Sequence, residues 1–232
     1  MNNYNLRRIH LFSPSIWQTI IPPSSYDKQE ILKTIEENYK ISSYRNEWGD
    51  VESRDNWHHT YGDEDNPKFK KVNLDKVNEQ YGMVLEKFIE AMKPIIPINY
   101  YYRVSNITAN KKNQSMRIHN HLSKVQETGK WVSYNAIHYM NFKKEHAGTK
   151  ILNPSIFAQY PKTFEHIADI FDSTIANNTE LNDAAIMDVK EDDIVIMPSY
   201  LNHGVDGANI DTDDLRITVV LNIWMERTNE QN

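Results

Sequence analysis

The stretch Ile98–Ile107, INYYYRVSNI, decides the fold class of this chain. Ile98, Tyr100, Tyr102 and Val104 occupy alternate positions, and Asn99, Tyr101, Arg103 and Ser105 lie between them. Because successive side chains of a strand point to opposite faces, this alternation is typical of a half-buried β-strand. The residues just before it repeat at helical spacing instead, so the pattern changes from helix to strand at Ile98.

Further strands are predicted downstream by runs of β-branched and aromatic residues bounded by polar or proline-containing turns. They are Ser115–Leu122, Lys130–Phe142, Gly148–Asn153, Ala185–Val189, Ile194–Met197 and Leu215–Met225. About seven strands at this spacing favour a β-sandwich or barrel. Apolar residues at helical spacing within Pro161–Ala176 predict an insertion around 155–183.

Upstream of Ile98 the pattern predicts one or two short strands in Arg8–Ile21 and a helix in Tyr26–Ile41. A second helix starts near Asn73 and stops at Pro94. The polar residues 42–72 form a long connection, which is typical of a functional loop or a weakly paired hairpin. The fold class expected is therefore mainly β with N-terminal helices (α+β).

No internal repeat or low-complexity segment divides the chain. We expect one domain over 1–232, with supporting elements in 1–97 and the β core in 98–232.

The amino-acid composition limits which metal ligands and catalytic groups the chain can offer. The 232 residues include no Cys, which excludes disulfides, zinc–thiolate sites and Cys nucleophiles. Any metal ligand must then be His, Asp or Glu.

The net charge of −6 without a Lys/Arg cluster argues against nonspecific nucleic-acid binding. No apolar run has the length of a signal or membrane segment, so we expect a cytoplasmic protein without membrane association.

The sequence MRIHNHL, Met116–Leu122, places His119 and His121 two residues apart in a predicted strand. Side chains at i and i+2 share one face, so both imidazoles can reach a single metal ion. Far downstream, His203 can supply a third ligand. Arg216 begins the last predicted strand, where a guanidinium can bind a carboxylate bidentately. Thr218 lies on the same face as Arg216 and can add a hydroxyl.

Other interpretations of these residues remain open. A His-x-His pair is also compatible with solvated or core-packed side chains. Arg216 can instead form a surface ion pair with Asp211, Asp213 or Asp214. Asp206 is an alternative carboxylate ligand if His121 does not bind. The remaining histidines divide into loop residues (His58, His59), surface residues (His10, His146, His166) and His138, which faces either the site or the outer sheet.

Several motifs occur in a shared order along the chain. They are Leu11–Ile16 (LFSPSI), His119–His121 (HNH), Ala136–Met140, Gly148 with Asn153-Pro154, Met197–Val205 (MPSYLNHGV) and Arg216–Thr218 with Asn222. With these motifs the chain resembles the 2-oxoglutarate/Fe(II)-dependent oxygenases. In particular, it resembles a small, uncharacterised branch common in marine phages and bacteria.

The resemblance implies a double-stranded β-helix core of the jelly-roll or cupin-like kind. It implies that His119 and His203 bind Fe(II), with His121 standing where the family has Asp or Glu. The C5 carboxylate of 2-oxoglutarate would pair with Arg216, assisted by Thr218, and Tyr139 is a further candidate for that binding site. Three neutral imidazoles make the centre more positive by one charge, which can tighten binding of the dianion but leaves the reaction outcome open.

The implied activity is hydroxylation of an unidentified substrate with release of succinate and CO2. That substrate is a small molecule, a peptide or a nucleobase. Two alternatives stay open: a three-His metal dioxygenase that does not use 2-oxoglutarate, and a non-catalytic metal-binding β-barrel domain. The sequence does not indicate an oligomeric state.

Overall fold

The computed structural model describes residues 5–10, 14–41, 57–60, 69–110, 115–154, 184–205 and 214–228. Its helices are η1 (Pro23–Ser25), α1 (Lys28–Ile41) and α2 (Asp75–Met92). Its strands are β1 (Arg7–His10), β2 (Ser15–Ile20), β3 (Trp57–Thr60), β4 (Ile98–Asn110), β5 (Met116–His119), β6 (Tyr134–Asn141), β7 (Thr149–Leu152), β8 (Ala184–Ile186), β9 (Asp193–Pro198), β10 (His203–Val205) and β11 (Arg216–Arg227). This mainly β structure with helices before the core confirms the predicted fold class.

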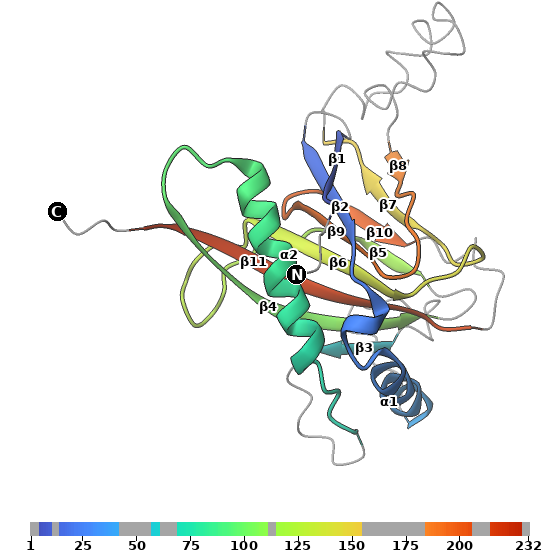
Figure 1. Ribbon diagram of the computed structural model, residues 1–232. Coiled ribbons are helices and arrows are strands. Elements are labelled where there is room, and N and C mark those ends of the chain that lie inside the picture. The colour runs from blue at the N-terminus through green and yellow to red at the C-terminus, as the bar shows by residue number, and fades with distance from the viewer. Residues whose placement is uncertain are drawn as a thin grey trace, which may run out of the picture.

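The strands form two antiparallel sheets (Figure 1). The large sheet has the order β1-β2-β9-β6-β11-β4-β3, and the small sheet has the order β5-β10-β7-β8. Strands distant in sequence pair directly, as β11 does with both β4 and β6. Two antiparallel sheets joined by such crossovers form the double-stranded β-helix core that the resemblance implies.

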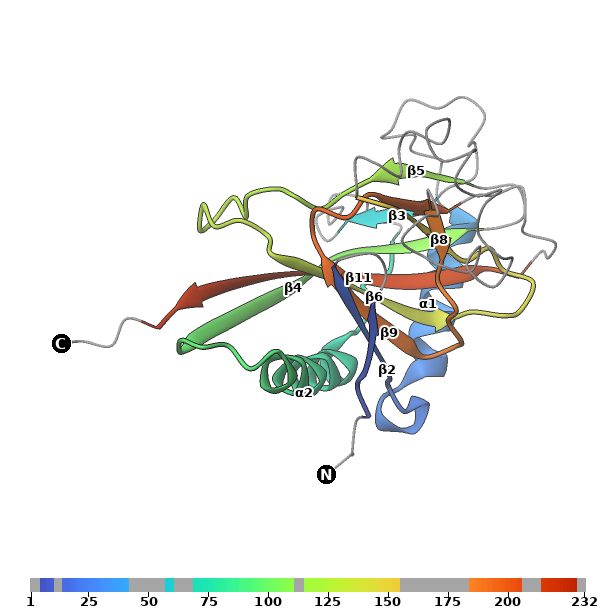
Figure 2. The same cartoon turned by 90° about the horizontal axis from the view of Figure 1, so that it is seen from above.

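The helices and the small sheet lie on opposite sides of the large sheet. Figure 2 shows α2 on one side of β4 and β11, and β5 on the other. The buried face of α2 comprises Val77, Gln80, Tyr81, Val84, Leu85 and Phe88, which confirms the predicted amphipathic helix. The Phe88 ring meets Trp17 and Tyr134 edge-on, with ring centroids 5.8 and 5.1 Å apart. No helix among the described residues is long and apolar enough to span a membrane.

Strand β11 separates two apolar cores because its side chains alternate. Ile217, Val219, Leu221 and Ile223 belong to the core that faces the helices. Val220 belongs to a second core between the sheets, the inter-sheet core, whose members are Ile16, Ile137, Tyr139, Ile151, Met187, Val189, Val195, Met197, Leu201 and Val220. Arg216, Thr218 and Asn222 occupy the alternate positions of β11 that Val220 also occupies, so they lie on the inter-sheet face.

Several predicted strand ends differ from the structure: β6 begins at Tyr134 instead of Lys130, and β8 ends at Ile186 instead of Val189. Strand β5 ends at His119 instead of Leu122, because the His121 backbone N–H donates to the Ser199 carbonyl (2.8 Å) and leaves the ladder with β10. In the connection 42–72, where a functional loop or a weakly paired hairpin was expected, Trp57–Thr60 form a strand, β3, whose Trp57 is paired with Ala109 of β4. The short strand β10 was not predicted, since its three residues are too few for a periodic pattern.

The predicted insertion around 155–183, the candidate Asp206 and the surface residue His166 lie outside the described residues. The division of the chain into one domain, 1–232, stays a prediction.

Candidate metal centre

The three histidines singled out in the sequence come together at one end of the small sheet. His203 on β10 is the direct cross-strand partner of His119 on β5, and His121 follows two residues after His119. The ring centroids are 4.6 Å apart for His119–His203 and 5.2 Å apart for the other two pairs. One ring nitrogen of each residue lies within 4.8 Å of those of the other two.

A glycine beside His203 allows this approach of β5 to β10. A Cβ added at Gly204 would lie 2.7 Å from the Met116 carbonyl oxygen and 2.9 Å from the Ile118 side chain. Any other residue would therefore push β5 away from β10. The tight packing at Gly204 keeps His119 opposite His203.

Each of the three imidazoles has its Nδ1 atom next to an oxygen acceptor. Nδ1 of His119 lies 2.8 Å from the Arg117 carbonyl, and Nδ1 of His203 lies 2.9 Å from the Leu201 carbonyl. Nδ1 of His121 lies 3.0 Å from Oδ1 of Asn222. Backbone carbonyls only accept, so Nδ1 carries the proton in His119 and His203 and Nε2 carries the lone pair. With the Asn222 amide oriented as in the structure, His121 has the same tautomer. This is the tautomer with which a histidine binds a metal through Nε2.

Burial also favours the neutral imidazole. It lowers the pKa of His203 to about 3, and proximity to His119 and His121 adds to the shift. Burial likewise lowers the pKa of His119, although the hydrogen bond to the Arg117 carbonyl opposes it. Because metal ligands must be unprotonated, these shifts suit a metal centre near neutral pH.

Arg216 is the first residue of β11 and lies on its inter-sheet face, six residues from Asn222 at the histidine end. Only 1% of its surface is exposed. Nε donates to the Ala147 carbonyl (3.0 Å), and an Nη2 hydrogen goes to Oγ1 of Thr149 (3.1 Å). Thr149 belongs to β7, so the arginine joins the two sheets. These bonds use two of its five N–H groups, and no described carboxylate pairs with it.

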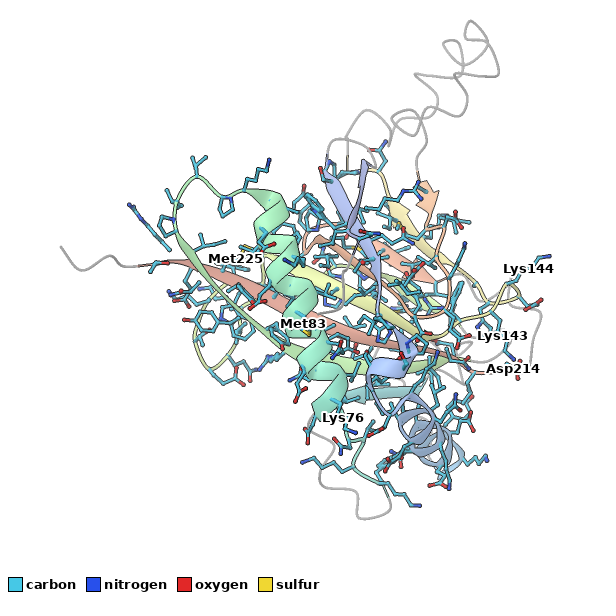
Figure 3. All side chains as sticks on the ribbon, viewed as in Figure 1. Lys76, Met83, Lys143, Lys144, Asp214 and Met225 are labelled. Carbon is cyan, nitrogen blue, oxygen red and sulfur yellow. The ribbon has the colours of Figure 1, made fainter. Side chains whose placement is uncertain are left out.

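The structure therefore contradicts the alternative in which Arg216 forms a surface ion pair with Asp214. Asp214 pairs with Lys143 at the edge of the molecule (Figure 3), whereas Asp211 and Asp213 lie outside the described residues. Burial lowers the pKa of Arg216, and the nearby Tyr139 opposes this shift. The guanidinium nevertheless stays charged, because its ordinary pKa is far above neutrality.

Two aromatic rings and the Thr149 hydroxyl lie next to the arginine. Its guanidinium carbon lies 5.4 Å from the Tyr139 ring centre and 5.9 Å from that of Phe142. The Tyr139 hydroxyl donates to Oγ1 of Thr149 (2.6 Å). Thr218 is buried two residues along β11, with its hydroxyl 2.5 Å from that of Thr108. The structure thus brings Tyr139, Thr218 and Arg216 together on the inter-sheet face.

Two other histidines had been given positions in the sequence analysis. His146 was predicted at the surface, and His138 was expected to face either the site or the outer sheet. His146 is instead only 5% exposed because the β6–β7 turn folds it against the arginine end. Its Nδ1 accepts the Lys143 N–H (2.9 Å), so Nε2 carries a proton, and this atom has no hydrogen-bond partner among the described residues. His138 faces the helices, where its Nδ1 lies 2.9 Å from the Tyr81 hydroxyl.

Sequence reasoning missed the contacts that cross between strands. Thr149 and Asn222 contact Arg216 and His121 respectively, but neither was assigned a role in the site. Alternation on β11 was a usable signal for Asn222, since it shares a face with Arg216 and Thr218. For Thr149 no signal was available, because β7 and β11 belong to different sheets.

We expect the imidazole 15N shifts of chelator-treated protein to report an Nδ1–H tautomer for His119, His121 and His203. His121 is the informative residue, because Asn222 can also donate if its amide is reversed. His203 should remain neutral far below the ordinary histidine pKa of 6.5, since burial lowers its pKa to about 3. An Nε2–H signal from any of the three, or titration of His203 near 6.5, would contradict this geometry.

No protein-family model and no curated protein matches the sequence. Solved structures similar to the chain include HygX from Streptomyces hygroscopicus with nickel and 2-oxoglutarate bound (TM-score 0.43, 10% identity, 89% of this chain and 82% of that chain). A Pseudomonas putida prolyl-4-hydroxylase has a TM-score of 0.45 at 9% identity over 94% of this chain and 95% of that one. A 2OG-Fe(II) oxygenase family oxidoreductase from Burkholderia pseudomallei has a TM-score of 0.47 at 8% identity over 89% and 84%. At these TM-scores and identities, the similarity does not extend to what this chain binds.

Proposed function

We propose that the chain is a non-haem Fe(II), 2-oxoglutarate-dependent oxygenase. The observation that carries the proposal is the pairing of two features on one buried face. Three imidazoles in the metal-binding tautomer lie at one end of this face, and a buried arginine without a described carboxylate partner lies at the other. The likeness to the branch found in marine phages and bacteria stays a prediction, as does the extent of the domain over 1–232.

The donor set fits a divalent transition metal. His119, His121 and His203 offer three imidazole nitrogens, which suit iron among other first-row metals. Metal–nitrogen bonds of about 2.1 Å allow ligand nitrogens up to about 4.2 Å apart. The ring nitrogens lie within 4.8 Å of one another, so the rings have to move closer together to bind a common ion. Three neutral ligands leave the full charge of the ion uncompensated, which favours an anionic cosubstrate.

Arg216 lies at the end of the proposed cosubstrate site opposite the three histidines. A carboxylate placed against its unused N–H groups would restore the pairing that a buried guanidinium requires. The Thr149 hydroxyl binds the guanidinium and accepts from the Tyr139 hydroxyl, and Thr218 lies two residues along the same face of β11. All four residues are buried. We infer that these residues bind the C5 carboxylate of 2-oxoglutarate.

The residues between the two ends are apolar. Ile137 and Val220 are direct cross-strand partners in the middle of this face, and both belong to the inter-sheet core. They lie between the Asn135–Asn222 pair at the histidine end and Tyr139 and Arg216 at the other. A polar–apolar–polar surface matches a dicarboxylate whose two ends are separated by methylene groups, as in 2-oxoglutarate.

Fe(II) with 2-oxoglutarate bound supplies oxygen activation coupled to oxidative decarboxylation, which releases succinate and CO2 and hydroxylates a substrate C–H bond. The contribution of this chain is to fix the three imidazoles by hydrogen bonds at Nδ1, to orient the cosubstrate through Arg216, and to exclude water with the inter-sheet core. The substrate is an unidentified small molecule, peptide or nucleobase.

One observation favours a second candidate function. The third ligand is His121, whereas the resemblance leads one to expect Asp or Glu, and three-His centres also occur in metal dioxygenases that do not use 2-oxoglutarate. A non-catalytic metal-binding barrel is the remaining alternative. Arg216 distinguishes the 2-oxoglutarate-dependent oxygenase from both alternatives, because only that enzyme requires a buried cation for the C5 carboxylate of 2-oxoglutarate.

Replacing Arg216 by Ala should weaken 2-oxoglutarate binding by at least about 30-fold, since truncating one partner of a buried charge pair costs 2 kcal/mol or more. Arg216→Lys keeps the charge but loses the bidentate geometry, and should give an intermediate loss. Anaerobic calorimetry on the Fe(II)-loaded protein measures the affinity, and the thermal midpoint reports folding. Arg103→Ala is the matched control, because Arg103 is exposed and pairs with Glu127. Unchanged 2-oxoglutarate affinity in folded Arg216→Ala protein would contradict the proposal.

Substitutions at His121 test whether it is a ligand. His121→Leu should lower Fe(II) affinity by more than the roughly 10- to 100-fold that follows loss of an outer-shell partner. His121→Asp should retain the metal but weaken 2-oxoglutarate binding, because the added negative charge opposes the dianion. Gln126→Ala, at an exposed residue just beyond the two histidines, serves as the control. If His121→Leu binds Fe(II) as tightly as the unmodified protein, His121 is not a ligand.

A further inference from the structure

Asn135 is an unusual residue for the interior of this protein. It lies on β6 with 0% of its surface exposed. Both polar atoms of its side chain, Nδ2 and Oδ1, are buried and have no hydrogen-bond partner among the described residues. Leaving a buried polar group unsatisfied costs of the order of 1–3 kcal/mol, and native structures contain few such groups. The amide therefore requires an explanation.

The strand register places this amide beside the histidines. Asn135 is the direct cross-strand partner of Asn222 on β11, whose Oδ1 lies 3.0 Å from Nδ1 of His121. On its other side Asn135 pairs with Met197 of β9, which belongs to the inter-sheet core. Cross-strand partners share a face, so the Asn135 side chain points between the sheets.

Two further contacts place His121 at this end of β6. Its backbone N–H donates to the Ser199 carbonyl, and the Ser199 N–H donates in turn to the Ser133 carbonyl (3.1 Å). Ser133 lies directly before β6 and Ser199 directly after β9. Asn135 is thus close to the metal end of the face, whereas Tyr139, four residues along the same strand, is at the arginine end.

We propose that Asn135 hydrogen-bonds the keto-acid end of 2-oxoglutarate through Nδ2. This inference rests on the proposed function and adds to it a residue for the metal-proximal end of the cosubstrate. The keto-acid carboxylate is rich in acceptors and lacks a donor, and a primary amide supplies two N–H donors. The opposite carboxylate already has Arg216, so a neutral amide at the metal end completes recognition without adding a charge near the ion.

Replacing an amide that binds a ligand should change the thermal midpoint of the free protein differently from replacing an amide that stabilises the fold. In ligand-free protein, Asn135→Leu keeps the side-chain shape and removes two unsatisfied groups, so the thermal midpoint should stay the same or rise. Asn38 provides a matched control, because it is also 0% exposed but is satisfied at both atoms. Its Nδ2 donates to the Lys70 carbonyl and its Oδ1 accepts the Lys70 N–H, both at 2.8 Å. Asn38→Leu should lower the midpoint.

The binding test compares two ligands on the full chain loaded anaerobically with Fe(II). 2-Oxoglutarate carries the keto acid, and butyrate keeps only the carboxylate proposed to pair with Arg216 and its methylene groups. Asn135→Leu should weaken 2-oxoglutarate binding by about tenfold or more, the size expected for a hydrogen bond to a charged group. Its affinities for Fe(II) and butyrate should match those of the unmodified protein. Arg216→Lys should weaken binding of both ligands.

The outcomes separate this inference from the proposed function. If the unmodified protein binds 2-oxoglutarate and Asn135→Leu binds it equally well, the role of Asn135 is overturned and the proposed function stands. A lower midpoint for Asn135→Leu, with equal losses for 2-oxoglutarate and butyrate, would show a structural role and also overturn it. If the unmodified, iron-loaded protein binds no 2-oxoglutarate, both proposals fail.

Discussion

The alternation of side chains along β11 is the constraint on which the rest of the structure depends. Every second residue from Ile217 to Ile223 packs against the helices, and the residues between them face the small sheet. A shift of one residue in register would exchange these sets, burying Arg216 in the helix-side core and exposing apolar side chains to the site. Pairing of β11 with β4 from Arg216 to Arg227, and with β6 on the other edge, holds the register.

The interior that results is polar where a protein of this size would ordinarily be apolar. Arg216, His203 and Asn135 are each almost fully buried, and each loses hydration that the chain itself replaces only in part. Hydrophobic residues of similar volume would stabilise the free protein more. Such groups are understandable if a bound metal ion and a dicarboxylate complete their interactions, in the way that functional sites commonly tolerate local instability.

Sequence periodicity predicted the fold class, both helices and most strands, because burial of one face leaves a regular pattern. The His-x-His spacing selected His119 and His121 and the MPSYLNHGV segment selected His203, and the structure brings the three within reach of one another. Neither pattern predicted how they meet: His121 leaves the strand to bond Ser199, and its ring is oriented by Asn222 from the other sheet. Thr149 beside Arg216, the burial of His146 and the unsatisfied amide of Asn135 likewise depend on which strands are neighbours, and a single sequence carries little information on that pairing.

The most direct test of the account is an anaerobic titration of the 232-residue chain with Fe(II) and then with 2-oxoglutarate, followed by visible absorption. Bidentate binding of the keto acid to Fe(II) gives a metal-to-ligand charge-transfer band. The account predicts that this band appears only when both are present and saturates at equimolar 2-oxoglutarate and iron. A folded protein that binds Fe(II) without developing the band, or that binds no Fe(II), would contradict it.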